Sequence, residues 1–155
     1  MNELKPFDDQ LAGLIGALSP AGRRKLAAEI AKELRKSQQQ RIKLQKAPDG
    51  TPYHARKRQP LRAKSGRIKR AMFQKLRSSR YMKANSRSDA AVVEFTGKVQ
   101  RIARVHQLGL KDKASQHSQD VQYPERRLLG LGYVEQWLIN ELIIKRLSCF
   151  SLSGH

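Results

Sequence analysis

Residues 90–109, AAVVEFTGKVQRIARVHQLG, are the stretch around which this chain is organised. They lie between a very basic first half and an amphipathic C-terminal segment, and they hold the strongest β-forming pattern in the sequence. Residues 90–95 predict a strand, because Val92 and Val93 are β-branched, Phe95 is aromatic, and polar residues or glycine stand on both sides.

Past Gly97 the spacing of the apolar residues changes to three or four, which indicates a short helix over 99–108. Arg101 and Arg104 are expected to face outward from this helix, and Gly109 closes it as a C-terminal cap. The residues that recur at helical spacing are Val99, Ile102, Ala103, Val105 and His106.

Helical spacing also precedes this stretch. A short amphipathic helix is expected over 7–18. Ser19 followed by Pro20 predicts the start of a second helix, which reaches about residue 44. The turn sequence PDGTPY at 48–53 then breaks the helical pattern.

Two further helices are expected. One resumes at residue 65 or 66, and its buried stripe consists of Ile68, Met72, Phe73 and Leu76. The other covers 133–147 and is expected to pack across the sheet and against the first helices. Its stripe contains Val134, Trp137, Leu138, Glu141, Leu142 and Lys145, and Ile143, Ile144 and Leu147 widen the apolar face.

The remaining strands are short. Residues 81–84 are expected to pair with 90–95 in a hairpin. Residues 110–120 are polar and predict a loop, and 121–123 alternate like a strand that Pro124 confines to a sheet edge.

These elements predict an α+β fold, in which N-terminal helices and a C-terminal helix pack on a small, mainly antiparallel sheet. The chain has 155 residues, enough for one domain with its own core. We expect that domain over 1–147, with a long, mobile basic loop at about 47–65 and a flexible tail at 148–155.

The net charge of +19 is unevenly placed. Residues 23–83 hold 21 Lys and Arg against 3 acidic residues, whereas the rest of the chain is almost balanced. Such a region attracts phosphate, an acidic protein surface, or both.

The cysteine content, the apolar runs and the N-terminal residues indicate the compartment of the protein. Cys149 is the single cysteine, so no intramolecular disulfide is possible and a reducing interior is expected. No apolar run approaches the roughly 18 residues of a membrane span, and the N-terminus lacks the pattern of a signal peptide. We therefore expect a soluble, intracellular protein.

Catalytic motifs are not recognisable. The histidines His54, His106, His117 and His155 are scattered, without a second ligand at metal-binding spacing. His106 is expected to make a structural hydrogen bond. The sequence predicts that the protein is not an enzyme and that it needs no cofactor or metal.

Four motifs in order carry a resemblance. They are PDGTPY at 48–53, MFQKLR at 72–77, RIARVHQLG at 101–109 and YPERRLLGL at 123–131. Together they resemble the phage virion morphogenesis family, the tail completion proteins of contractile-tailed temperate phages. The resemblance covers most of the chain.

The resemblance implies a structural protein of the virion tail or neck, assembled in the host cytoplasm. It would join the head-proximal end of the tail late in assembly, as a ring that is often sixfold, and enable head–tail joining. Its implied partners are further copies of itself, the tail tube or sheath, and the head–tail connector proteins. Because a neck ring surrounds or approaches DNA, the resemblance also implies non-specific contact with DNA. No membrane partner is expected.

Two sets of residues are expected to contact these partners. The motif residues assigned to subunit or neck contacts are Arg101, Arg104, His106, Gln107, Tyr123, Arg126 and Arg127. The basic patch assigned to a partner or to DNA contains Arg56, Lys57, Arg58, Arg62, Lys64, Arg67, Lys69 and Arg70. Core packing is the alternative for Ile102, Val105, Leu128 and Leu129.

Two other interpretations stay open. A non-sequence-specific nucleic-acid-binding protein would use the same charge, although the basic region has few aromatic residues for stacking. A regulatory adaptor that folds on an acidic host protein would use residues 54–65 but leaves the later motifs unexplained.

Overall fold

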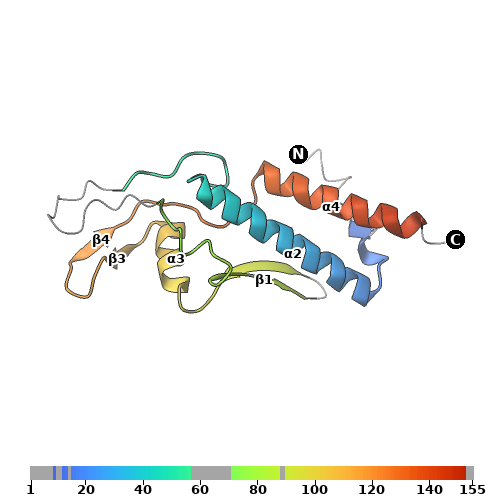
Figure 1. Cartoon of the computed structure of the whole chain (residues 1–155), viewed down its shortest axis with the longest axis horizontal. Helices are drawn as coiled ribbons and strands as arrows, with labels where there is room; N and C mark the ends of the chain where they lie inside the picture. The colour runs from blue at the N-terminus through green and yellow to red at the C-terminus, as the bar shows by residue number, and fades with distance from the viewer. Residues whose placement is uncertain (1–8, 10–11, 14, 57–70, 88–89, 153–155) are drawn as a thin grey trace. The chain divides into compact units, whose positions relative to one another are not determined.

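The computed structural model describes residues 9, 12–13, 15–56, 71–87 and 90–152. Its helices are α2 (Pro20–Lys43), α3 (Gln100–Leu108) and α4 (Tyr133–Leu152), and its strands are β1 (Met82–Ser86), β2 (Ala91–Phe95), β3 (Lys111–Lys113) and β4 (Asp120–Gln122) (Figure 1). Among the described residues, the strands form two separate two-stranded sheets, β1–β2 and β3–β4. The predicted α+β class is confirmed, with two hairpins in place of one sheet.

The chain divides into two compact units, described separately below. The first unit contains Met1–Lys36, Ala84–Glu94 and Tyr133–His155, and the second contains Ser37–Lys83 and Phe95–Gly132. Helix α2 contributes its longer, N-terminal part to the first unit and its last turns to the second.

The start of α2 follows the sequence prediction. The Ser19 hydroxyl accepts a hydrogen bond from the Gly22 backbone N–H at 3.0 Å, and Pro20 occupies the first helical position, where no N–H is needed. In the predicted helix before it, the described residues 9, 12–13 and 15–16 are helical.

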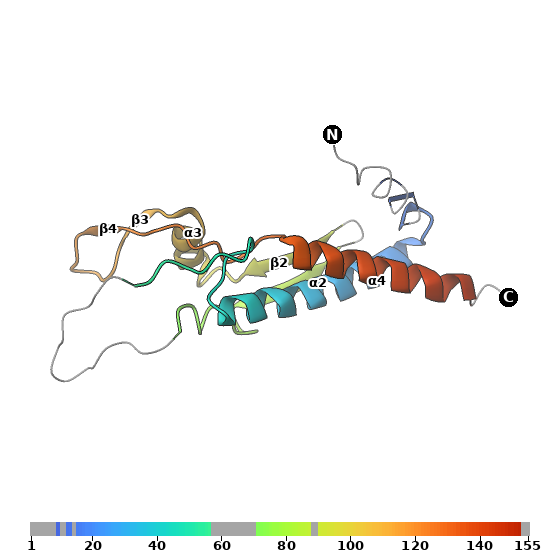
Figure 2. The ribbon, with the colours of Figure 1, turned by 90° about the horizontal axis from the view of Figure 1, so that it is seen from above.

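The core of the first unit lies between α2 and α4, which run side by side (Figures 1 and 2). Leu26 and Ile143 are buried at its centre. The partly buried side chains around them are Ile15, Leu18, Ile30, Ile139 and Leu147. Complete burial of one such aliphatic side chain stabilises a fold by about 1.5–3 kcal/mol.

The predicted stripe of α4 is wrong in part. Val134 and Trp137 are 70% and 65% exposed, whereas Ile139, Ile143 and Leu147 face the core. The helix is apolar on more than one side, so its spacing alone did not decide which side would be buried. It also continues through Leu152, so the predicted flexible tail at 148–155 begins inside the helix.

Both hairpins are antiparallel, and only the first was predicted. Strand β1 pairs with β2 across a tight connection in which the Arg87 N–H donates to the Ala90 carbonyl at 2.8 Å. Strands β3 and β4 pair with Asp112 opposite Val121. Strand β3 lies in the segment expected to be a loop, whereas β4 overlaps the strand predicted over 121–123. These three-residue strands are mostly polar, so backbone pairing alone reveals them.

The predicted helix that ends near Leu76 is also wrong where it is described. Residues 71–80 form turns, and Phe73 has a φ of +65°, which no helix accommodates. Residues 65–70 of that prediction lie outside the described residues. Leu76 is nevertheless buried, so its predicted place in a core is confirmed.

Candidate interaction surface

Gly109 brings two of the four motifs together in the second unit. It ends α3 with a φ of +65°, and its N–H donates to the Val105 carbonyl, as expected of a helix cap. A Cβ at this position would lie 2.9 Å from the Glu125 backbone nitrogen, so the close approach requires glycine. The cap therefore lets the 123–130 segment lie directly against the end of α3.

Gln107 holds that segment by its backbone. Its Nε2 donates to the Leu129 carbonyl at 2.8 Å, and its Oε1 accepts from the N–H groups of Leu128 at 2.7 Å and Leu129 at 2.9 Å. The 123–130 segment forms no helix or strand, so side chains and backbone groups of other segments satisfy its backbone groups. Gln107 does this from the last turn of α3.

Side chains near the C-terminal end of α2, together with Tyr53, bind the backbone of the same segment. Buried Gln38 donates to the Gly130 carbonyl at 3.1 Å and accepts from the Gly130 N–H at 3.2 Å. Arg41 donates to the Leu128 carbonyl at 2.9 Å, and the Tyr53 hydroxyl donates to the Arg127 carbonyl at 2.8 Å. The segment is thus fixed by side chains that are distant in sequence.

Arg126 is a buried arginine, with only 5% of its surface exposed. Its backbone N–H donates to the His106 carbonyl at 2.8 Å, and its guanidinium donates to the carbonyls of His54 at 2.8 Å and Ala55 at 3.1 Å. Burial lowers the pKa of Arg126, and the charge of Arg56 lowers it further. Its side chain joins the 123–130 segment to the residues just after the PDGTPY turn.

One aromatic ring from each of the four motifs contributes to a row in the second unit. Phe73 lies edge-on between Tyr53, at 5.6 Å between ring centroids, and His106, at 4.8 Å. His106 also meets Tyr123 at 5.0 Å. Such edge-to-face pairs add about 0.5–1.5 kcal/mol each beyond the apolar area that they bury. The four motifs therefore share a structural centre.

Burial lowers the pKa of His106 to about 4, and the charge of Arg126 acts in the same direction. The ring is thus neutral near pH 7. Within the described part of the chain, its buried Nδ1 has no hydrogen-bond partner. The predicted structural hydrogen bond of His106 belongs to its backbone carbonyl, while its ring packs against Phe73 and Tyr123.

The seven motif residues assigned to contacts thus divide by exposure. Arg101, Arg104 and Arg127 are exposed, whereas Arg126 is buried and the other three are partly buried. In the basic patch, Arg56 is exposed, and its other members, from Lys57 to Arg70, lie outside the described residues.

A shallow depression of about 560 Å³ lies beside Arg101. Arg101 donates to the Asp112 carboxylate at 2.6 Å, and this bond lowers the pKa of Asp112. Ile102 was expected on the inner face of α3 but is 51% exposed here. The sequence did not indicate Lys98 or Lys113, because the β3–β4 hairpin that completes the depression was not predicted. Its lining consists of Lys98, Arg101, Ile102, Asp112, Lys113, Ser115 and Gln116.

The described residues contain no group of three or more His, Cys, Asp or Glu side chains placed to hold a metal ion. Among the same residues, no helix combines the length and apolar character needed to cross a bilayer.

Comparison with known proteins agrees with the four motifs. The tail completion protein S of Escherichia phage P2 is 49% identical over 148 residues, which cover 95% of this chain and 99% of that protein. No solved structure matches the chain. The profile of the phage virion morphogenesis family matches residues 2–148. The chain belongs to the phage virion morphogenesis family.

Proposed function

We propose that this protein completes the phage tail during virion assembly, at the head-proximal end, so that the tail can join a filled head. The observation that carries the proposal is the 49% identity to a tail completion protein along almost the full length of both chains. The protein would act as a structural component of the virion tail, after assembly in the host cytoplasm.

The partner contacts are assigned to the outward side of the second unit. His106, Gln107, Tyr123 and Arg126 build this unit through internal contacts, and in doing so they fix the direction of their exposed neighbours. Arg101 and Arg127 have 79% and 59% of their side chains exposed, and Arg104 is exposed as well. These three arginines would meet acidic groups on tail tube, sheath or connector proteins.

The bond between Arg101 and Asp112 is compatible with this role. Exposed ion pairs contribute only about 0.2–1 kcal/mol, so a partner carboxylate can replace Asp112 with little loss. The net positive lining of the depression would speed the approach of an acidic partner.

A ring of copies, often sixfold in neck proteins, is the proposed assembly. Head-to-tail contacts close into rings when the rotation between neighbours permits, and the hairpins offer edges for such contacts. The basic patch from Arg56 to Arg70 would then contact a partner protein or the genome that passes through the neck.

Complementation tests the assembly role. A phage that lacks this gene is supplied with the wild-type protein, with Arg101→Glu/Arg104→Glu, or with Arg24→Glu/Lys32→Glu as a control of equal charge change on exposed residues of α2. We expect the first variant to fold but to leave unjoined tails in electron micrographs, and the control to restore infectious particles. Full complementation by the first variant would refute the assigned contact.

Non-specific DNA binding is the second candidate, because residues 23–83 carry nearly all of the excess charge. Such binding depends on the number of neutralised phosphates and weakens steeply with salt. If it were the function, the purified protein would retain duplex DNA at physiological salt, and Arg24→Glu/Lys32→Glu, which lies inside this region, would weaken retention at least as much as Arg101→Glu/Arg104→Glu. If tail completion is the function, Arg101→Glu/Arg104→Glu should impair tail joining, whereas Arg24→Glu/Lys32→Glu should not.

A further inference from the structure

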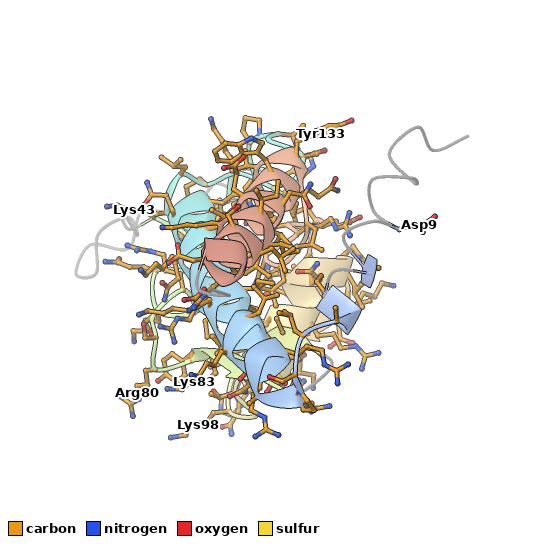
Figure 3. The ribbon with its side chains drawn as sticks, turned by 90° about the vertical axis from the view of Figure 1, so that its right-hand side faces the viewer. Asp9, Lys43, Arg80, Lys83, Lys98 and Tyr133 are labelled. Atoms are coloured by element: carbon orange, nitrogen blue, oxygen red, sulfur yellow. The ribbon has the colours of Figure 1, made fainter. Side chains whose placement is uncertain are left out.

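Helix α4 carries an unusual exposed stripe. Tyr133 is 92% exposed, Val134 70%, Trp137 65% and Ile144 42%. Figure 3 shows Tyr133 at the outer surface of the first unit. Val134, Trp137, Glu141 and Ile144 follow one another at spacings of three and four residues, so they form one line, which we call the α4 outer stripe.

The outer stripe is not needed for the core of its own unit. The core side of α4 is supplied by Ile139, Ile143 and Leu147, which pack against α2. Single exposed apolar residues are ordinary, but a line that includes Trp137, with exposed Tyr133 one helical turn away, has the composition of an interface centre. Within the part of the chain that the structure describes, the stripe is therefore left open to a partner.

Charge distribution selects the occupant. The chain carries +19, and nearly all of this excess lies in residues 23–83, where two copies would repel each other. Helix α4 lies outside this region and holds two acidic and two basic residues. Glu135 is buried and Arg146 binds Glu29, which leaves Glu141 and Lys145 as the charged residues on the exposed side. A second copy can approach this helix without facing like charge.

The same charges select the orientation. A parallel pair would set each Glu141 beside its own counterpart, whereas an antiparallel pair opposes the two helix dipoles. With the two-fold axis level with Ile139, Val134 lies opposite Ile144 of the second copy, Trp137 opposite Glu141, and Tyr133 opposite Lys145. The Trp137 N–H then has a carboxylate acceptor, and Lys145 has an aromatic face.

We propose that two copies of this protein associate through the α4 outer stripe in this antiparallel arrangement. The contact is isologous and closes on two copies, so it differs from the head-to-tail contact that a ring requires. It does not depend on the proposed role in tail completion.

The first test uses the full chain and measures mass by light scattering. Trp137 is the only tryptophan of the sequence, so its emission reports burial of the stripe directly. We expect the wild type to be a dimer that dissociates on dilution, with emission that moves to longer wavelength. Ile144→Glu should be monomeric with red-shifted emission at all concentrations, and Leu44→Glu, which changes an exposed leucine in the second unit, should remain dimeric.

The second test fixes the orientation, in a Cys149→Ser background. A short thiol-specific cross-linker should join Val134→Cys protein to Ile144→Cys protein in a mixture, and should leave each variant alone largely unlinked. Linking of Val134→Cys to itself would overturn the antiparallel arrangement.

A monomeric wild type, or a dimer unaffected by Ile144→Glu, would overturn the pairing altogether. Complementation separates this outcome from the proposed function. A monomeric wild type that still completes tails would refute the α4 contact alone.

Discussion

The Gln107 side chain and the Leu129 backbone exchange two hydrogen bonds, one in each direction, at 2.8 and 2.9 Å. The amide of Gln107 thus pairs with Leu129 as a neighbouring strand would, and it also accepts from the Leu128 N–H. A single side chain at the end of α3 therefore replaces a sheet partner for residues 128–129.

Replacing Gln107 by Ala should lower the free energy of unfolding by about 1–3 kcal/mol, because it leaves partly buried backbone groups of Leu128 and Leu129 without partners. Urea denaturation followed by circular dichroism measures the change. Gln116→Ala, at an exposed position of the β3–β4 connection, is the control and should lie within about 0.5 kcal/mol of the wild type. Equal midpoints for the two variants would show that the Gln107 bonds contribute little.

Gly109→Ala should destabilise the protein more than Gly50→Ala. Both glycines have positive φ, at +65° and +89°, so both substitutions carry a backbone strain of roughly 1–2 kcal/mol. An added Cβ meets nothing within 4 Å at Gly50 but lies 2.9 Å from the Glu125 nitrogen at Gly109. We expect the overpacking to add about 1–3 kcal/mol at Gly109 alone, which paired unfolding curves will show. Equal losses would mean that the 123–130 segment moves aside easily.

His106 should make stability fall as the pH is lowered. Its pKa is about 4 in the folded protein and 6.5 as the ordinary value, so between these pH values the unfolded chain binds more protons. The contribution of neutral His106 to the free energy of unfolding is therefore fully present above about pH 6.5. It is lost progressively as the pH falls toward 4. His106→Phe keeps an aromatic ring and should flatten this slope in urea midpoints measured across the range.

His117→Phe is the matched control, since His117 lies in the β3–β4 connection away from the aromatic row. It should leave the slope as in the wild type. If His106→Phe shows the full wild-type slope, the acid sensitivity of the protein lies in other groups.

The ion pair of Glu29 with Arg146 should be measurable in a double-mutant cycle. Arg146 donates two hydrogen bonds to the carboxylate, one from Nε at 2.6 Å and one from Nη2, and this bonding lowers the pKa of Glu29. Because both side chains are about 40% exposed, solvent screening limits the coupling to roughly 0.5–1 kcal/mol.

The cycle uses Glu29→Gln and Arg146→Gln, and the more exposed Lys36–Glu33 pair on α2 serves as the comparison with a coupling near zero. The Glu29 contribution should be present at neutral pH and should fade as the pH falls through its lowered pKa. Identical coupling energies for the two pairs would show that the two hydrogen bonds from Arg146 to Glu29 add no measurable stability.

Several elements were predictable because their determinants are local. Ser19 and Pro20 fixed the start of α2, β-branched and aromatic residues marked β2, and Gly109 marked the end of α3. The four motifs also pointed to the family, which the comparison with known proteins confirms. Each of these inferences needed only neighbouring residues or residue identity.

The candidate site was predictable only in outline. Arg101, Arg104 and Arg127 are exposed, and their contact role stays a prediction. Gln107 and Arg126 use their polar groups in hydrogen bonds to backbone carbonyls of their own chain. Polar residues in a motif look alike in sequence whether they face a partner or a bare carbonyl of their own chain. That choice is made by the irregular 123–130 segment, whose path no local pattern describes.

The sequence by itself determined the α+β class, the ends of α2 and α3, the uneven charge and the family. Only the tertiary structure decided that the four motifs share one row of rings, that residues 71–80 turn instead of continuing a helix, and that α4 turns Trp137 outward and Ile143 inward. The physical reason is that capping, strand propensity and charge act within a few residues. The buried face of an apolar helix and the partners of an unpaired backbone depend instead on contacts between residues far apart in the chain.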